Sequence, residues 1–315
     1  MIVAVTGINS GLSKALVPKL QAEPSIEKII GVDVAEYEGS SDKIEFIKMD
    51  VRDKAGMERA LQGVDVVIHL AFIVFPEKLP KLKVIYDINV NGSKTVFQAA
   101  AKNNVKKIIY TSSQSVYGHV KECPEIVTED SPRLGIKTTN FYYSHTKALV
   151  EKFLDELEKT YPNIAVVRFR PPIIAGENFI RNLSILSPKK GKTMFFPQIG
   201  NRHQGLQLVH QDDLTDAIII AMKKDVHGAY NISSNRISDL ARLAEEEYGA
   251  KVIRIPIPVF LVKMVIGLGR LWTFLRWLQA ILYASLLNTE KIKRELGWKP
   301  KYSTEDCLRE TIKDE

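Results

Sequence analysis

One tyrosine and one lysine in this chain are spaced for proton transfer at an alcohol. Two Tyr-x-x-x-Lys spacings occur, at Tyr117–Lys121 and Tyr143–Lys147, and about one is expected by chance among 11 tyrosines. Tyr117 is followed at once by Gly118, just past a predicted strand, where a spacing of four has no helical meaning. Tyr143 instead opens an amphipathic run of good helix formers. Tyr143 and Lys147 therefore share one face of a predicted helix.

A tyrosine acts as a base only when its pKa falls toward neutrality. Lowering a phenol pKa from near 10 to about 7 needs roughly 4 kcal/mol. A cation about 4 Å away supplies about 1 kcal/mol in water and about 4 kcal/mol at an effective dielectric near 20. The pair is therefore expected in a partly desolvated site, where a positive nicotinamide can add to the effect. Ser113, at the end of a predicted strand, could hydrogen-bond the substrate oxygen, or alternatively only its own strand-end turn.

The turn after the first predicted strand can hold a diphosphate. It has the sequence Thr6-Gly7-Ile8-Asn9-Ser10-Gly11-Leu12-Ser13 and leads into a predicted helix. Gly7 permits a tight turn, Gly11 removes a β-carbon where backbone approaches the anion, and the helix amino terminus offers free N–H groups. Two glycines alone are a weak signal, and a simple strand–helix turn is the alternative. The position between strand and helix favours the phosphate site.

Asp33 ends the second predicted strand, about 20 residues beyond the glycine turn, where a carboxylate can accept both hydroxyls of an adenosine ribose. A 2′-phosphate would meet like charge there, and no Arg or Lys follows until Lys43. The sequence therefore predicts NAD rather than NADP. The alternative is a solvated aspartate at a strand end.

A parallel α/β sheet would bring these groups together. Apolar runs bounded by turn formers predict strands at Val3–Thr6, Lys28–Val32, Ile44–Lys48, Val64–His69, Lys106–Thr111 and Ile164–Phe169. Helices are predicted at Leu12–Ala22, at Lys54–Leu61, and over a longer segment that ends at Lys102. The alternation predicts a doubly wound parallel sheet with helices on both faces and binding residues beyond the carboxyl ends of the strands.

The alternation of predicted strands and helices becomes irregular from about residue 170. Helices are predicted at Asp212–Met222 and Ile237–Tyr248, between irregular segments rich in proline, glycine and lysine. We therefore expect a dinucleotide-binding domain over residues 1–170, which includes the Tyr-Lys helix. Residues 171–315 are expected to form a smaller, partly interleaved substrate-binding part, with segments that return to the main domain.

The composition limits the class of protein. The 315 residues are 45% hydrophobic and 26% charged, which is typical of a globular chain. Two cysteines exclude a disulfide scaffold and a cysteine-built zinc site and suit a reducing cytosol, so a cytoplasmic location and no metal are expected. The net charge of +7 comes without a basic aromatic platform or a groove-reading motif, so nucleic-acid binding is not predicted.

The most apolar segment is Ile253–Leu287, which is broken by Lys263, Arg270 and Arg276. Its longest uncharged piece, Trp277–Asn288, is shorter than the roughly 20 residues of a membrane span. The first interpretation is a set of helices packed on the main domain as a substrate lid. The second is peripheral membrane contact at 255–287, or a pocket for a hydrophobic alcohol or ketone such as a lipid or sterol-like molecule.

Together these motifs resemble the extended short-chain dehydrogenase/reductase family, the NAD-dependent epimerase/dehydratase group. Matching pieces follow one another along nearly the whole chain: the glycine turn at 6–13, Asp33, Met49-Asp50-Val51-Arg52-Asp53, His69-Leu70-Ala71, Asn89-Val90-Asn91-Gly92, Ser113 with Val116-Tyr117-Gly118, Tyr143-x-x-x-Lys147, Arg170-Pro171-Pro172 through Gly176, Val209-His-Gln-Asp-Asp213, Tyr230-Asn231 and Leu296-Gly-Trp-Lys-Pro300. The ordered set is far more specific than any one piece.

The resemblance implies a Rossmann-type fold, NAD as cofactor and a small-molecule substrate. It implies hydride transfer at a secondary alcohol or ketone carbon by an epimerase or a dehydrogenase, and a homodimer formed through the helices around residues 79–102 and 142–159. Three alternatives stay open: a nucleotide-sugar 4-epimerase, a dehydrogenase of a hydrophobic alcohol, and a non-catalytic NAD-binding sensor or scaffold.

The resemblance also implies a role for individual residues. Tyr143 becomes the general base or acid, Lys147 its electrostatic partner that also holds the cofactor ribose, and Ser113 the donor to the substrate oxygen. The expected cofactor contacts are Gly7, Asn9, Ser10, Gly11 and Leu12 at the diphosphate turn, Asp33 at the ribose, Asp50 and Val51 beside adenine, Leu70 and Ala71 over the adenosine half, Asn89 and Pro171 nearer the nicotinamide, and Thr111, Tyr143 and Lys147.

Some residues depart from the family pattern. Ser13 stands where the family usually has glycine, which concerns the packing of helix on strand. Members that dehydrate nucleotide sugars carry Asp-Glu directly after the serine or threonine, whereas this chain has Gln114 and Ser115. That difference argues against dehydratase chemistry.

Two further departures concern the substrate. Ile173 and Leu206 stand where nucleotide-sugar members usually have Asn and Arg, so both polar groups are missing. Lys190, Lys192 and Arg202 lie near enough in sequence to substitute for them. A sugar-nucleotide substrate is therefore weakened as an expectation without being excluded.

Overall fold

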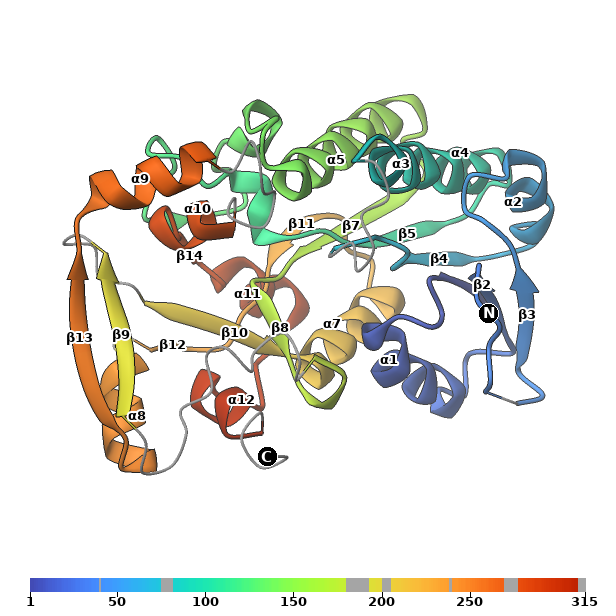
Figure 1. The fold of residues 1–315 in the computed structure, drawn as a ribbon. Helices are drawn as coiled ribbons and strands as arrows, with labels where there is room; N and C mark the ends of the chain where they lie inside the picture. The colour runs from blue at the N-terminus through green and yellow to red at the C-terminus, as the bar shows by residue number, and fades with distance from the viewer. Residues whose placement is uncertain are drawn as a thin grey trace.

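The computed structural model describes residues 1–39, 41–74, 82–179, 193–199, 205–237, 240–268 and 277–310 (Figure 1). Its centre is a seven-stranded sheet of order β11-β7-β5-β4-β1-β2-β3, in which every neighbouring pair is parallel. These strands are β1 Ile2–Thr6, β2 Lys28–Asp33, β3 Ile44–Lys48, β4 Val66–His69, β5 Lys107–Thr111, β7 Ala165–Arg170 and β11 Gly228–Asn231. The predicted Rossmann-type doubly wound sheet is confirmed, and each predicted strand is present within two residues of its predicted ends.

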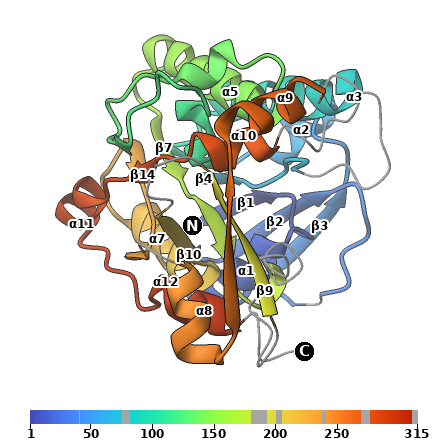
Figure 2. The same ribbon diagram turned by 60° about the vertical axis from the view of Figure 1, so that its left-hand side comes forward.

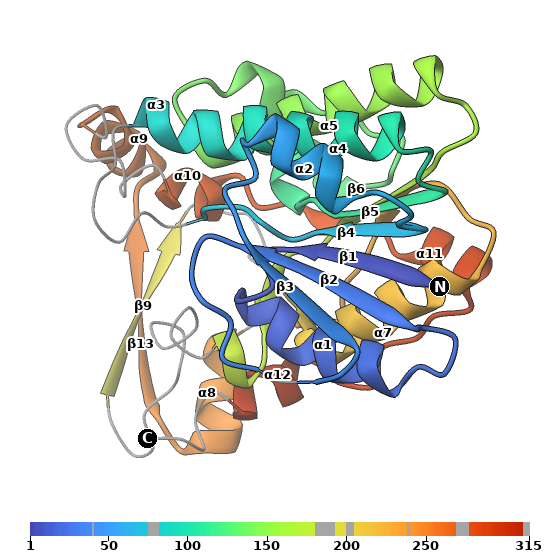
Figure 3. The ribbon, with the colours of Figure 1, turned by 90° about the vertical axis from the view of Figure 1, so that its right-hand side faces the viewer.

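Helices cover both faces of the sheet, as the alternating pattern predicts (Figures 1 and 3). On one face lie α1 (Gly11–Ala22) and α7 (Gln211–Lys223), and on the other lie α2 (Lys54–Ala60), α4 (Ser93–Lys102) and α5 (Tyr142–Thr160). The longer helix predicted to end at Lys102 is instead α3 (Leu82–Tyr86), a wider π-helical stretch η1 (Asp87–Gly92), and then α4.

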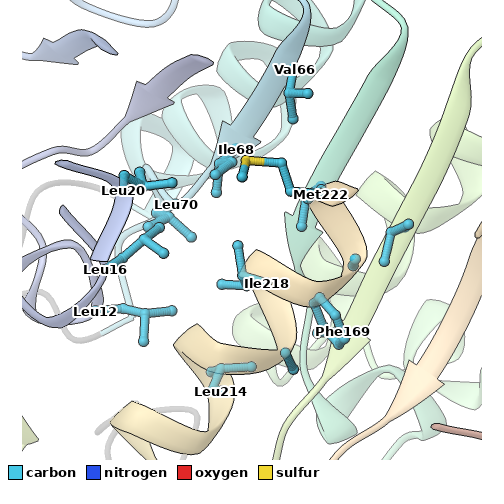
Figure 4. Close-up of a cluster of buried hydrophobic side chains, with 14 of the residues drawn as sticks. Leu12, Leu16, Leu20, Val66, Ile68, Leu70, Phe169, Leu214, Ile218 and Met222 are labelled. Carbon is cyan, nitrogen blue, oxygen red and sulfur yellow. The ribbon is translucent and has the colours of Figure 1, made fainter. Parts of the chain in front are cut away.

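The spacing of the leucines in α1 determines how this helix packs on the core. Leu12, Leu16 and Leu20 recur every fourth residue, so they line one face of α1 and are buried. Figure 4 shows these leucines facing Leu214 and Ile218 of α7 above the sheet. This packing fixes the amino terminus of α1, and therefore the glycine turn, against the carboxyl end of β1.

The rest of the chain builds small sheets and helices around this unit. They are the 3-10 turns η2 (Gln114–Tyr117), η3 (Leu134–Lys137) and η4 (Glu177–Phe179), the strands β6 (Ile126–Val127), β8 (Ile173–Ala175), β9 (Thr193–Ile199), β10 (Leu206–His210), β12 (Arg236–Ile237), β13 (Lys251–Ile257) and β14 (Leu286–Leu287), and the helices α8 (Leu240–Tyr248), α9 (Val259–Leu268), α10 (Trp277–Leu282), α11 (Glu290–Leu296) and α12 (Thr304–Glu310). β8, β10 and β12 form one sheet, β9 pairs with β13, and β6 pairs with β14. The ribbon of β9 and β13 stands at one side of the molecule in Figure 1 and faces the viewer in Figure 2.

The last strand of the central sheet comes from the second half of the chain. β11 pairs in parallel with β7, and Asn231 stands opposite Arg170 at the carboxyl end. Among the residues that the structure describes, no helix has both the length and the hydropathy to cross a bilayer.

Candidate active site

Tyr143 lies in the first turn of α5. Lys147 and Glu151 follow it at intervals of four residues, so the three side chains share the face of α5 that turns toward the sheet. Lys147 and Glu151 are buried, whereas Tyr143 is half-buried. The Tyr-x-x-x-Lys pair predicted to be helical is therefore on a helix, at the carboxyl end of β5.

Ser113 joins the end of β5 to the tyrosine. Its hydroxyl oxygen accepts a hydrogen bond from the Ser115 backbone N–H at 3.1 Å, which is the strand-end turn expected as the alternative. Ser113 also hydrogen-bonds the side chain of Tyr143. Burial raises the pKa of Tyr143, and the hydrogen bond with Ser113 lowers it by less. Tyr143 therefore keeps its proton at neutral pH until further positive charge reaches it.

Lys147 is held over two aromatic rings. Its Nζ donates a hydrogen bond to the Thr111 carbonyl at 2.7 Å and lies 3.7 Å from the ring centroid of Phe72 and 4.7 Å from that of Tyr110. Burial lowers the pKa of Lys147 to about 7, opposed by the charge of Glu151. The ring of Phe72 also meets Tyr143 edge-on, at 6.0 Å between centroids. Phe72 therefore packs against both members of the pair.

Glu151 anchors this face of α5 to the sheet. It accepts hydrogen bonds from Ser112 Oγ at 2.6 Å, from Arg170 Nε and Nη2 at 2.9 and 2.6 Å, and from Arg133 Nη1 at 3.2 Å. Burial acts to raise the pKa of Glu151, but the charges and hydrogen bonds of Arg170, Arg168 and Ser112 together lower it to about 2. Glu151 and Phe72 were not predicted as site residues. The available signals were the position of Glu151 four residues after Lys147 and that of Phe72 three residues after the end of a strand.

The other tyrosine of the two spacings lies in a buried network. Tyr117 donates a hydrogen bond to Asn231 Oδ1 at 2.6 Å and accepts one from Arg170 Nη1 at 2.8 Å. Burial raises the pKa of Tyr117 to about 12. Because Arg170 also binds Glu151, Tyr117 connects the anchor of α5 to the edge strand β11.

The glycine turn lies directly beside the end of β4. Gly7 has a φ of 72°, and a β-carbon there would lie 2.7 Å from the Ala71 backbone nitrogen. Leu70 and Ala71 therefore approach the turn through their backbone, which only glycine allows. Ser13, where the family usually has glycine, is buried and donates a hydrogen bond to the Gly7 carbonyl at 2.8 Å.

The amino terminus of α1 follows this turn. Ser10 caps the helix by accepting a hydrogen bond from the Ser13 backbone at 3.3 Å, and no acidic residue lies in the first turn. Leu12 is buried in the core. A β-carbon at Gly11 would lie 3.2 Å from the Asn178 carbonyl oxygen, so the short helix η4 covers the turn from outside.

Asp33 sits at the mouth of the same turn. One carboxylate oxygen accepts a hydrogen bond from the Asn9 backbone at 3.1 Å, and the other accepts one from the Ala35 backbone at 3.1 Å. The Asn9 side chain donates to the carbonyls of Ala35 and Glu36 at 3.0 and 3.3 Å, away from the helix terminus. The structure thus brings Asp33 and the glycine turn together.

The remaining predicted cofactor contacts are engaged with protein groups. Asp50 pairs with Arg52 at 2.7 Å, and the hydrogen bond from Arg52 lowers its pKa. Asn89 is buried and exchanges two hydrogen bonds with the Ile73 backbone, at 2.8 and 2.9 Å. These residues shape the walls beside the site, since Asn89 fixes the segment that carries Phe72.

Val51 and Pro171 complete that set. Val51 is buried beneath η1, where a β-carbon at Gly92 would lie 2.7 Å from Val51 Cγ2. The Pro171 carbonyl accepts a hydrogen bond from the Gln114 backbone at 2.8 Å. Pro171 thereby fixes the turn that starts at Ser113.

The positions that distinguish substrates carry no charge. The Gln114 side chain donates to the Ser285 carbonyl, and Ser115 Oγ hydrogen-bonds with His119 at 3.1 Å. Ile173 on β8 is 44% exposed, and Leu206 on the neighbouring β10 is half-buried. Lys190, Lys192 and Arg202, the possible substitutes for missing polar groups, lie outside the described residues.

These residues fit a bound dinucleotide. The glycine turn leads into the amino terminus of α1, whose first turn carries no acidic residue. Asp33 offers a carboxylate at the end of β2, and Lys147 offers a cation beyond β5. The chemistry of this set suits a diphosphate flanked by two riboses.

Comparison with known proteins gives a consistent result. The profile described as the NAD dependent epimerase/dehydratase family matches residues 3–233. An uncharacterized protein of Mycobacterium tuberculosis (strain ATCC 25618 / H37Rv) is 27% identical, over 98% of this chain and 82% of its own length. UDP-glucose 4-epimerase 1 of Oryza sativa subsp. japonica is 26% identical, over 86% of this chain and 79% of its own length.

Solved structures share the fold. The UDP-glucose 4-epimerase of Thermotoga maritima with UDP-glucose superposes with a TM-score of 0.72 at 20% identity, over 99% of this chain and 98% of its own. DesIV is a dTDP-glucose 4,6-dehydratase of Streptomyces venezuelae, solved with NAD and TYD bound. It superposes with a TM-score of 0.72 at 22% identity, over 99% of this chain and 96% of its own.

Proposed function

Since the chain belongs to the NAD dependent epimerase/dehydratase family, we propose that it is an NAD-dependent epimerase or dehydrogenase acting at a secondary alcohol or ketone carbon. The cofactor is NAD. One observation carries the proposal: Tyr143, hydrogen-bonded to Ser113, stands one helical turn before the buried Lys147, at the same sheet edge as the glycine turn. Residues 171–315 would supply most of the substrate contacts.

Each part of the site would hold one part of the cofactor. The backbone N–H groups after Gly7 would bind the diphosphate, Asp33 the adenosine ribose and Lys147 the second ribose. NAD, when bound, accepts a hydride from the substrate carbon and brings the positive charge of its oxidised ring. Asp33 also disfavours a 2′-phosphate by like charge.

The protein's own task is to move one proton. Tyr143 Oη would take the proton of the substrate hydroxyl during oxidation and return it during reduction, while Ser113 Oγ holds the substrate oxygen. Because burial raises the pKa of Tyr143, the phenol gives a base only when cationic charge offsets that burial. The Lys147 ammonium supplies part of this charge, and Phe72 and the Thr111 carbonyl stabilise it.

Two substrate classes are supported by different observations. The UDP-glucose 4-epimerases among the relatives favour a nucleotide sugar. The uncharged, half-exposed Ile173 and the neighbouring Leu206 favour a hydrophobic alcohol or ketone. Gln114 and Ser115, held by Ser285 and His119, offer no carboxylate for dehydration.

The direct test combines turnover with cofactor binding. UDP-galactose and a panel of hydrophobic secondary alcohols are offered with NAD: sugar turnover without reduced-nicotinamide absorbance indicates an epimerase, and growth of that absorbance indicates a dehydrogenase. Tyr143→Phe should lower turnover about 10²- to 10⁴-fold, while NAD affinity, measured by titration calorimetry, stays nearly unchanged.

Retained turnover in Tyr143→Phe would reject the proposed proton carrier. NAD binding without turnover of any member of either class would favour a non-catalytic NAD sensor or scaffold. A homodimer through the helices of residues 79–102 and 142–159 remains a proposal, and α4 and α5 pack side by side on one outer face, as such an interface needs. Sedimentation of the purified protein measures its assembly state.

A further inference from the structure

Helix α9 is apolar apart from Lys263, yet much of it faces outward. Its inner residue Val262 is buried in a cluster with Ile199 and Leu282. On its outer side Phe260 is 67% exposed and Met264 is 59% exposed. A helix that is apolar all round is normally buried. An outer face of this kind therefore needs something to cover it.

The ribbon that leads into α9 also exposes apolar side chains. Ile253 and Ile255 on β13 are 39% and 43% exposed, and their spacing of two puts them on one side of the ribbon. Phe195 on β9 stands opposite Ile253 and is 65% exposed. β13 then runs into α9 at one side of the molecule (Figure 1). We call these exposed side chains of β13, β9 and α9 the apolar face.

The charged residues from Lys251 to Thr289 are all basic. The chain has 37 acidic residues, but none lies between Lys251 and Thr289 in the sequence. Lys263 lies in the outer face of α9, between Phe260 and Met264, and is exposed. On β13, Arg254 lies 3.6 Å from Glu245 of α8. The exposed Lys263 of α9 lies in a segment without acidic residues, which suits a surface that carries negative charge.

We propose that the apolar face, with α9 at its centre, docks on an anionic lipid bilayer. Phe260, Leu261 and Met264 would enter the boundary between headgroups and acyl chains, and Lys263 would contact lipid phosphates. The ten residues of α9 span about 15 Å, about half of a bilayer core, so the helix lies in the membrane plane.

A second copy of the chain fits the same face less well. In a two-fold dimer the same patch meets itself, so Lys263 would face like charge with no carboxylate from this segment to neutralise it. The homodimer expected from the family uses other helices, α4 and α5 among them. An anionic bilayer would contact both the apolar side chains and Lys263.

The docking surface lies at the same end of the molecule as the candidate active site. The strands of the central sheet run toward the end where α9 lies (Figure 3). Tyr143, Ser113 and the glycine turn are at these carboxyl ends. A bilayer on α9 would therefore lie near the mouth of the site, where a hydrophobic substrate dissolved in lipid could enter.

The test is vesicle flotation of the full-length protein without substrate. Vesicles of phosphatidylcholine alone are compared with vesicles that also contain phosphatidylglycerol. We expect flotation with the anionic vesicles and weaker flotation as salt rises. The double variant Phe260→Ser, Met264→Ser should bind about tenfold more weakly, and Lys263→Glu about fivefold to tenfold more weakly.

Matched controls make equivalent changes at the far end of α5. Tyr161 is 44% exposed and Lys159 is exposed, so Tyr161→Ser and Lys159→Glu remove the same kinds of group away from the apolar face. Both controls should float like the unmodified protein, and thermal unfolding should show that every variant is folded.

Three results would overturn the proposal. The first is no flotation of the unmodified protein with anionic vesicles. The second is equal flotation of the α9 variants and the controls. The third is a dimer that the double serine variant converts to monomer without any vesicle binding, which would assign the face to a second copy. None of these results depends on catalysis, so they are distinguishable from failure of the proposed function.

Discussion

Replacing Glu151 with glutamine should measure how strongly α5 is anchored to the sheet. The carboxylate is fully buried and is bound by Ser112, Arg133 and Arg170. Glutamine keeps the shape but removes the charge, which leaves the buried Arg170 without its counterion. Breaking a buried ion pair from one side costs about 3–5 kcal/mol.

The pKa of Glu151 gives a second value for the free energy of unfolding that its buried charge contributes. The pKa falls from 4.5 to about 2 on folding, which corresponds to about 3 kcal/mol of stability at neutral pH. Because the folded pKa is the lower one, this stability is complete above pH 4.5 and is lost as the pH falls toward 2. The cost of breaking the ion pair and the free energy from the pKa shift therefore agree at about 3 kcal/mol.

The assay is denaturant unfolding at pH 7 and pH 3. We expect Glu151→Gln to lower the free energy of unfolding by about 3 kcal/mol at pH 7 and by less than half of that at pH 3. At pH 3 the Glu151 carboxyl is already protonated in the unfolded chain, so forming the folded carboxylate requires release of that proton. Glu156→Gln, at an exposed carboxylate on the same helix, should change it by at most about 0.5 kcal/mol. A loss below about 1 kcal/mol at pH 7, or an equal loss at both pH values, would refute the reasoning.

Three other substitutions test neighbouring parts of the site. Tyr117→Phe removes the hydrogen bond to Asn231 and should lower the free energy of unfolding by about 1–3 kcal/mol. Turnover per folded molecule should stay unchanged, and lost turnover would give Tyr117 a catalytic role. Gly7→Ala introduces a β-carbon at positive φ and should weaken NAD binding at least about tenfold in a fluorescence titration, whereas unchanged affinity would separate the turn from the cofactor. Phe72→Leu removes the ring under Lys147 and should lower the pKa of the lysine. The alkaline limb of the pH–rate profile should then move about one pH unit toward acid. An unmoved limb would show that the ring does not stabilise the ammonium.

The sequence predicts the inner strands of the central sheet well because they are buried on both faces. Such strands are apolar runs of four to six residues between turn formers, and the predicted Val3–Thr6, all of it buried, lies within the observed Ile2–Thr6. β11 was not predicted, because Gly228-Ala-Tyr-Asn231 is short and only half apolar. Its pairing with β7 comes from tertiary structure and not from local preference.

The candidate site is predictable only where local spacing determines it. The helical position of Tyr143 and Lys147 follows from their sequence, whereas the ring under Lys147 depends on how α5 crosses the end of β4. Glu151 was missed because an acid on a helix is usually solvated, and its counterion Arg170 lies on a different element. Long-range partners of this kind leave no pattern in neighbouring residues.

The origin of the outermost strand has a consequence for synthesis on the ribosome. β7 is complete at Arg170, but β11, which covers its open edge, ends about 60 residues later at Asn231. At about 5–20 residues per second, that edge stays bare for roughly 3 to 12 s while the chain emerges. Its unpaired N–H and C=O groups are then available to other nascent chains. We expect this interval to be when the protein most needs protection from aggregation.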